Sequence, residues 1–204
     1  MLEENKQLKQ QQNCKNKLHR KFTIAKNPQI SYDTLFKIMV LSMPVWTPHV
    51  TVATVVEKDG RFLFVEEHSE GFVHTVFNQP AGHVECGETI IEAAIRETLE
   101  ETGHHVEVDH LLGIYTYTPP MFPDRTYYRF CFLAHVTTVE ENAQLDIGIV
   151  GAVWMNLEEL QESARARSPL VLKAVEDALA GKKYPLSLIY EHPFSPSLTS
   201  HLDA

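Results

Sequence analysis

The chain has 204 residues, of which 44% are hydrophobic, and its 18 Lys and Arg against 27 Asp and Glu give a formal net charge of −9. This length accommodates one domain and an appendage, and the composition is ordinary for a folded globular protein. The acidic balance disfavours a nucleic-acid-binding function unless basic groups line one groove.

Residues 1–42 differ in charge from the rest of the chain, because they hold eight Lys and Arg but only three Asp and Glu. Residues 1–20 are rich in Gln, Lys and Asn without apolar periodicity, which indicates a disordered extension. The run Leu35–Val45 is too short to span a bilayer and too far from the terminus for a signal peptide. We therefore expect a basic extension over 1–42, a folded domain over 46–190, a tail over 191–204 and no membrane association.

The three cysteines, Cys14, Cys86 and Cys131, are widely spaced and form no CxxC pair. An odd number of cysteines without metal-ligand spacing is typical of reduced thiols. The cysteine pattern therefore favours a cytoplasmic protein.

The folded part begins with strand patterns. We expect strands over Val50–Val56, Phe62–Glu66 and Phe72–Phe77. Asp59 and Gly60 mark a hairpin turn between the first two, and the segment Asn-Gln-Pro that follows Phe77 ends the third.

The stretch Gly82–His104, GHVECGETIIEAAIRETLEETGH, is the most informative in the chain. Thr89 and Glu92 have the spacing of a capping box at a helix start, and Gly103 is placed to end that helix in the left-handed conformation. On a helical wheel the apolar side is formed by Ile91, Ala94, Ile95 and Thr98.

Three glutamates, Glu97, Glu100 and Glu101, fall together on the other side of this helix, at i, i+3 and i+4. Like charges so placed repel, and only Arg96 is near enough to neutralise them. A solvated acidic face is one interpretation, but such faces usually interleave lysines and this one has none. A divalent cation is the other, since Mg²⁺ prefers carboxylate oxygens and keeps positions open for phosphate and water. The cluster alone leaves both interpretations open.

After the helix, apolar and polar residues alternate less regularly. We expect strands over Val106–Val108, Leu112–Thr118, Tyr127–Val136 and Ala152–Met155, and helices over Glu158–Ser163 and Leu170–Ala180. Strands around two or three helices, without an internal repeat, favour an α/β sandwich with a mixed sheet.

Written as a pattern, the informative stretch is G-x5-E-x7-R-E-x-x-E-E-x-G, formed by Gly82, Glu88, Arg96, Glu97, Glu100, Glu101 and Gly103. With these residues at this spacing, the sequence resembles the Nudix hydrolases, whose signature box has this form. Thr98 and His104 stand at two positions that are usually aliphatic, and these departures concern packing. The resemblance extends to the segments FNQPAGHVE and RSPLVLKAVEDALAGKKYPLSLI and covers about residues 46–190.

The resemblance implies the Nudix fold, in which a mixed β-sheet is sandwiched between helices. It implies Mg²⁺-dependent hydrolysis of phosphoanhydride bonds, with Mn²⁺ as a substitute cation. The implied substrates are nucleoside di- and triphosphates, hydroxymethylpyrimidine pyrophosphate and thiamine pyrophosphate, from which phosphate is released.

The resemblance also assigns roles within the box. It implies that the metal ligands are Glu97, Glu100, Glu101 and the backbone carbonyl of Gly82. Arg96 and Glu88 match an internal ion pair that orients the glutamates, with an ordinary surface pair as the alternative. The general base stays open between Glu97 and Glu100.

Residues outside the box are candidates for substrate contacts. The amides of Asn78 and Gln79 could read a pyrimidine edge, although turn chemistry explains them nearly as well. Strand alternation places Tyr127 and Arg129 on one face, where with Arg125 they could stack a base or hold a phosphate. Packing roles are the competing interpretation.

Two other functions remain as alternatives. Pro119 and Pro120 lie where the ADP-ribose pyrophosphatases of this family carry a proline. The other alternative is a catalytically silent domain that only binds nucleotides, although such a domain has no need for a repulsive glutamate cluster. For the leading function we expect a monomer or homodimer that acts on a small phosphoanhydride and not on nucleic acid.

Overall fold

The computed structural model describes residues 46–192 of the chain. Its central strand is β1 (His49–Lys58), which pairs antiparallel with β2 (Arg61–Glu67) and β4 (Ala81–His83) and parallel with β6 (Tyr127–Val139). Both faces of β1 are covered, and this explains why its sequence is a continuous β-branched run instead of an alternating one.

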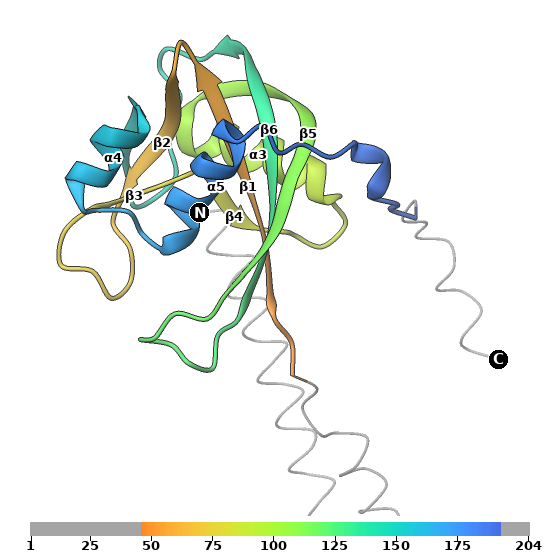
Figure 1. Cartoon of the computed structure of the whole chain (residues 1–204), viewed down its shortest axis with the longest axis horizontal. Helices are drawn as coiled ribbons and strands as arrows, with labels where there is room; N and C mark the ends of the chain where they lie inside the picture. Colours follow the sequence, from red (N-terminus) through yellow and green to blue (C-terminus); the bar gives the residue numbers. More distant parts are fainter. Residues whose placement is uncertain (1–45, 193–204) are drawn as a thin grey trace, which may run out of the picture. The chain divides into compact units, whose positions relative to one another are not determined.

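The other strands extend the sheet on both sides of β1 (Figure 1). On one side β2 pairs with β3 (Val76–Asn78) and β7 (Ile149–Met155), and on the other β6 pairs with β5 (His104–Tyr117). The result is a mixed sheet of seven strands, which confirms the predicted α/β class.

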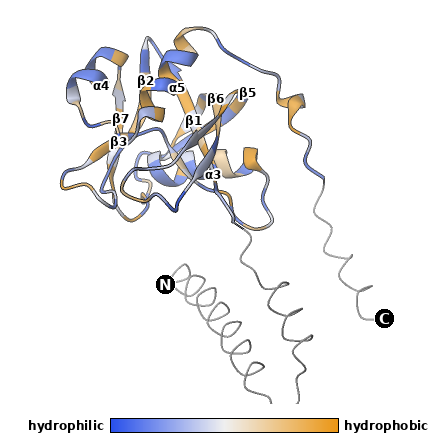
Figure 2. Ribbon diagram, turned by 60° about the horizontal axis from the view of Figure 1, so that its bottom comes forward, coloured by the Kyte–Doolittle hydropathy of each residue, from blue (hydrophilic) through white to orange (hydrophobic). Residues whose placement is uncertain are grey.

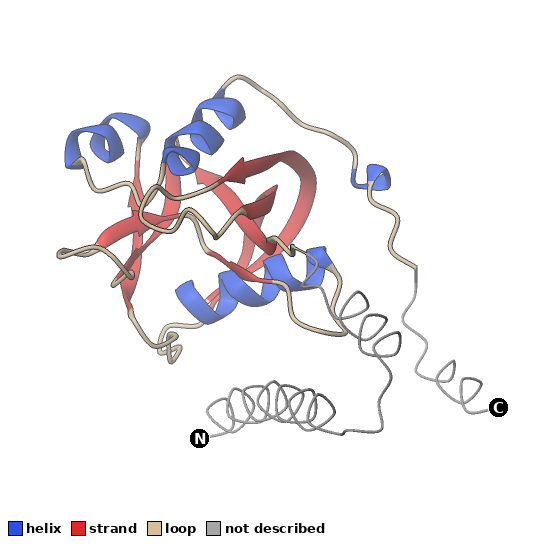
Figure 3. Ribbon diagram, turned by 90° about the horizontal axis from the view of Figure 1, so that it is seen from below, coloured by secondary structure: helices blue, strands red, loops and turns tan. Residues whose placement is uncertain are grey.

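Helices cover both faces of this sheet. Figures 2 and 3 show α3 (Ile90–Thr102) on one side and α4 (Leu157–Ser163) with α5 (Pro169–Leu179) on the other. Two apolar clusters fill the spaces between, one joining Val52 to Ala93 and the other joining Phe64 to Val171. The short 3-10 helix η1 (Leu186–Leu188) follows and packs Leu186 against the α3 cluster.

The predicted turn and helix ends are confirmed. Asp59 and Gly60 have φ values of 53° and 76°, as a tight hairpin turn requires. Thr89 caps α3, and its side chain and that of Glu92 form the reciprocal hydrogen bonds of a capping box. Gly103 ends α3 with φ 70°, the left-handed conformation that glycine adopts without steric cost.

Three of the predicted strands are wrong in extent. Of the segment 72–77 only the end belongs to β3; its start belongs to a turn in which the Phe72 N–H donates to the Ser69 carbonyl at 3.2 Å. The segments 106–108 and 112–118 are not separate strands but parts of β5. Irregular register with β6 disturbs the alternation of β5 and produced the apparent gap.

Some of the expectations concern segments outside the described residues, and others concern the cysteines. The basic extension over 1–42, Cys14 and nearly all of the tail lie outside residues 46–192. Cys86 is an exposed free thiol and Cys131 a buried one. Among the described residues, no helix has the length and apolarity needed to cross a bilayer.

Candidate active site

The glycine loop of the box brings β4 against α3. A side chain at Gly82 would collide with the carboxylate of Glu97, since a Cβ built there falls within bonding range of the carboxylate atoms. Glycine is therefore required at this position for the glutamate to reach the β4 backbone.

Glu97 and Glu101 are buried, with only 8% and 7% of each residue exposed. The Ala81 N–H, in β4, donates to Glu101 Oε2 at 2.8 Å. The solvated-face interpretation is therefore wrong for these two glutamates, because β4 covers the side of α3 that carries them. The side chain of Glu100 is 36% exposed.

Arg96 collects the other carboxylates of the box. Its Nη1 donates to Glu97 Oε1 and Glu100 Oε2, both at 2.8 Å, and its Nη2 donates to Glu88 Oε1 at 2.7 Å. The same Nη2 donates to the carbonyl oxygen of His83 at 3.0 Å, which ties the helix to the glycine loop. The predicted ion pair with Glu88 is thus present as one part of a wider cluster, and it lowers the pKa of Glu88.

Burial dominates the electrostatics of the two buried glutamates. It raises the pKa of Glu97, and it raises that of Glu101 to about 9, with further contributions from the nearby charges of Glu67, Glu97 and Asp146. Carboxylates that are so desolvated and so close together are stabilised in their ionised form by a cation.

The donor set fits a divalent metal ion in its chemistry. Within residues 46–192 no three His, Cys, Asp or Glu side chains are gathered into one ligating group. The hydrogen bonds explain this, since Arg96 holds Glu97 and Glu100 while the Ala81 N–H holds Glu101. The oxygens of these carboxylates, beside a backbone that has no Cβ at Gly82, are the ligands that Mg²⁺ prefers.

Sequence reasoning missed two acidic residues near the cluster. Asp146, in the loop before β7, donates its N–H to the Glu100 carbonyl oxygen at 3.1 Å, and its charge acts on Glu97 and Glu101. Glu67, at the end of β2, is 8% exposed and acts on Glu101 in the same way. Neither residue belongs to a spacing pattern, so only the fold reveals them.

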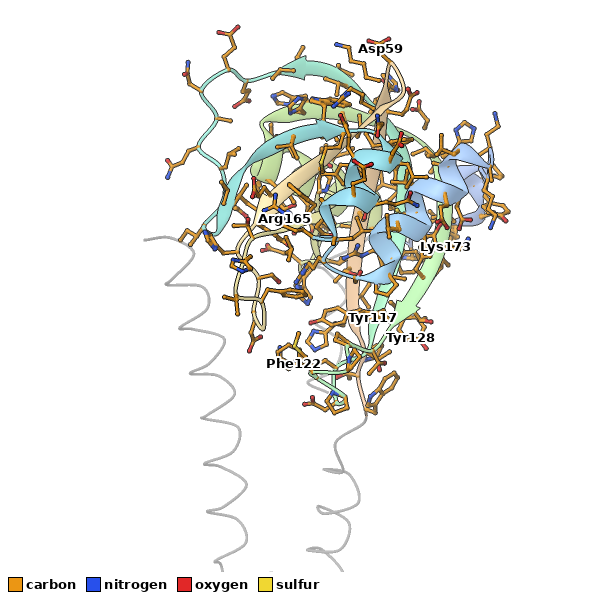
Figure 4. The ribbon with its side chains drawn as sticks, turned by 60° about the vertical axis from the view of Figure 1, so that its left-hand side comes forward. Asp59, Tyr117, Phe122, Tyr128, Arg165 and Lys173 are labelled. Carbon is orange, nitrogen blue, oxygen red and sulfur yellow. The ribbon has the colours of Figure 1, made fainter. Side chains whose placement is uncertain are left out.

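A pocket lies at the end of the sheet away from the β1–β2 turn, where Figure 4 labels Tyr117 and Phe122. Its lining residue Arg167 pairs with Glu67, which joins the pocket to the acidic cluster. The lining includes three predicted substrate contacts, Arg125, Tyr127 and Arg129. Two loops close over it: Arg125 Nη1 donates to Glu70 Oε2 at 2.8 Å, and Met121 packs against Gly71.

Tyr127 also connects the pocket to the box. Its ring stacks on His49 with the centroids 5.0 Å apart, and His49 Nδ1 lies 3.1 Å from Nε2 of His83, which follows Gly82 directly. A chain of contacts from Tyr127 through His49 to His83 therefore links the pocket to the glycine loop.

Asn78 and Gln79 lie beneath the pocket and are not in its lining. They are 0% and 1% exposed, and Gln79 Nε2 donates to the Val171 carbonyl at 2.8 Å. Arg129 Nη1 donates to Asn78 Oδ1 at 3.3 Å. Gln79 is therefore bonded to α5 and Asn78 to Arg129.

The model of the NUDIX domain family matches residues 46–175 of the chain. The curated phosphatase NudJ of Escherichia coli (strain K12) is 38% identical over 151 residues, covering 72% of this chain and 95% of that protein. A solved NUDIX hydrolase from Nitrosomonas europaea is 44% identical with a TM-score of 0.70, covering 73% of this chain and all of its own.

A third relative shows how far the fold extends beyond sequence similarity. The MutT NUDIX hydrolase from Burkholderia pseudomallei is 21% identical with a TM-score of 0.52, covering 64% of this chain and 98% of its own, and shows the likeness of fold alone. With a family model over more than half of the chain, and a 38% identical relative matched over nearly its full length, the chain belongs to the Nudix family and is a Nudix hydrolase acting on phosphoanhydrides.

Proposed function

We propose that the protein is a Mg²⁺-dependent phosphatase of small organic diphosphates and triphosphates. It releases the terminal phosphate of the substrate as inorganic phosphate. Mn²⁺ is expected to substitute for Mg²⁺. The proposed substrates are nucleoside di- and triphosphates, hydroxymethylpyrimidine pyrophosphate and thiamine pyrophosphate. The similarity to the phosphatase NudJ supports this choice, and the cysteine usage supports action in the cytoplasm.

The observation that carries the proposal is the burial of Glu97 and Glu101 against β4. Burying two carboxylates is costly, because an isolated charge is unfavourable in a low-dielectric site. Such a costly feature indicates a functional role. A site for a cation is the role that fits their position, with Glu97, Glu100, Glu101 and the Gly82 carbonyl as proposed ligands. When bound, the cation neutralises phosphate charge and lowers the pKa of a bound water.

The chain's own residues supply orientation and proton transfer. Arg96, held between Glu88, Glu97 and Glu100, fixes the directions of these side chains before substrate arrives. Glu97 and Glu100 are the candidates for accepting the proton of the attacking water. Arg125, Tyr127 and Arg129 in the pocket are the proposed contacts with the rest of the substrate.

The experiment is a phosphate-release assay on a nucleoside diphosphate, hydroxymethylpyrimidine pyrophosphate and ADP-ribose, each with Mg²⁺, Mn²⁺ or EDTA. We expect free phosphate from the two diphosphates with either metal, none in EDTA, and intact ADP-ribose. Consumption of ADP-ribose alone, with AMP and ribose phosphate as products, would replace the proposal with internal cleavage.

A further inference from the structure

The segment Arg167–Leu170 leads from α4 into α5 and is not part of the box. The Phe77 N–H donates to the Arg165 carbonyl at 2.8 Å, and the Arg167 N–H donates to the Phe77 carbonyl at 2.9 Å. These bonds fix the segment beside β3, so that Arg167, Ser168 and Leu170 reach the pocket lining.

Arg167 presents its guanidinium to the pocket. Its Nε donates to Ser69 Oγ at 3.0 Å and lies 3.2 Å from Glu67 Oε1, which positions the side chain. Within residues 46–192 its two terminal nitrogens make no hydrogen bond, and the side chain is 36% exposed. The end of this side chain therefore has hydrogen-bond donors to offer.

Arg129 lines the same pocket from β6. Its Nε is buried and, among the described residues, has no hydrogen-bond partner. Burial lowers the pKa of Arg129, and the charge of nearby Arg167 lowers it further. Two arginines that share a pocket are stabilised by an anion between them.

The N-terminus of α5 adds to this positive potential. Ser168 is the N-cap residue, but its side chain makes no capping hydrogen bond, and Pro169 at the next position has no N–H. The hydroxyl of Ser168 and the positive end of the 11-residue helix are therefore available to an anion in the pocket.

The two arginines lie within reach of the box. Arg129 pairs with Thr51 across the sheet, and Thr51 pairs in turn with His83. Two strand spacings separate Arg129 from the glycine loop, a distance of about 10 Å. The charge of Glu101 also acts on Arg129. A small substrate can therefore contact both places at once.

We propose that Arg167, Arg129 and Ser168 bind the phosphate that stays on the organic half of the substrate, while the box binds the phosphate that is released. The inference rests on the proposed function and narrows it to organic diphosphates whose product is a phosphate monoester. In the hydrolysis a water oxygen bonds to the terminal phosphorus and the bridging P–O bond breaks. The bridging oxygen leaves on the monoester with its electron pair, in the pocket of the arginines.

The test is binding of cytidine monophosphate to the full chain in EDTA, followed by calorimetry, so that the metal takes no part. Arg167→Gln is expected to weaken binding tenfold or more, because charge-assisted hydrogen bonds to phosphate are lost, and Arg167→Lys is expected to restore part of it. Arg165→Gln is the matched control, since Arg165 pairs with Glu66 as Arg167 pairs with Glu67 but does not line the pocket. The control should bind within twofold of wild type.

The same variants are then compared in hydrolysis of cytidine diphosphate with Mg²⁺, where Arg167→Gln should raise KM more than it lowers kcat. Wild-type monophosphate binding by Arg167→Gln, or no binding by the wild type, overturns the inference. If Glu101→Gln abolishes hydrolysis while Arg167→Gln keeps the wild-type KM, the proposed function stands and the inference alone is wrong. Should Arg167→Gln not fold, Arg167→Lys and Ser168→Ala carry the same comparison.

Discussion

Replacing Gly82 with alanine tests whether the close approach of the Glu97 carboxylate to the β4 backbone is needed for activity. The new methyl would take the place of the Glu97 carboxylate, which sits at the end of a flexible side chain and can swing away. Gly82 has no positive φ, so alanine adds no backbone strain. Losing the Arg96–Glu97 hydrogen bond costs about 1 kcal/mol. Alanine makes the unfolded chain less flexible than glycine does, and this offsets about 0.4–1 kcal/mol of that cost.

The net change in the free energy of unfolding is then below about 1 kcal/mol, so the melting temperature should shift by no more than about 2–4 °C. Turnover should fall about 100-fold or more, because a displacement of about 1 Å in a reacting group has effects of this size. Phosphate release and a thermal melt are measured on the same preparation. The control is Gly151→Ala, since a Cβ at Gly151 meets nothing within 4 Å. Wild-type turnover in Gly82→Ala would refute the placement of Glu97 as a ligand.

Three further substitutions follow from the contacts described. Glu101→Gln should lower turnover by about two orders of magnitude or more and leave the melting temperature unchanged, since an amide oxygen can still accept the Ala81 N–H; near wild-type phosphate release at saturating Mg²⁺ would contradict this. Hydrogen bonds from Lys173 and Lys182 lower the pKa of Asp177 from 3.8 to about 2, so this carboxylate stabilises the fold above about pH 4 and the effect is lost as the pH falls toward 2. Because both lysines are about half exposed, Asp177→Asn should cost about 1 kcal/mol at pH 7 and less at pH 3 by urea unfolding, and equal losses at the two pH values would disprove the linkage. Thr54→Val removes the buried 2.7 Å hydrogen bond to Thr98 and should cost about 1 kcal/mol by the same measurement, with an unchanged midpoint as the contrary result.

Local chemistry made part of the structure predictable. The turn at Asp59 and Gly60 depends only on neighbouring residues, and so does the capping box of Thr89 and Glu92. Helical periodicity correctly places Glu97 and Glu101 together on α3. Each of these features is determined within a few residues, so the amino-acid pattern is enough. The predicted separation of these glutamates from the apolar side is wrong, because both share the buried face of α3 with Ala94 and Thr98.

Contacts between distant segments were not predictable. Arg167 meets Glu67 across 100 residues, and no spacing rule joins them. The burial of Glu97 depends on where β4 lies, and β4 lies there because it pairs with β1. Thr98, which departs from the aliphatic pattern of the box, is explained only by its partner Thr54 on β1. The polar interior of the site is thus a product of sheet pairing.

The contacts of Arg96 have a consequence for how the protein should respond when the proposed cation is removed. One guanidinium already counterbalances Glu88, Glu97 and Glu100 from within the helix and loop that carry them. Part of the repulsion among these carboxylates is therefore relieved within the polypeptide itself. We therefore expect that EDTA abolishes phosphate release without unfolding the protein. Adding the metal back should restore activity without a refolding step.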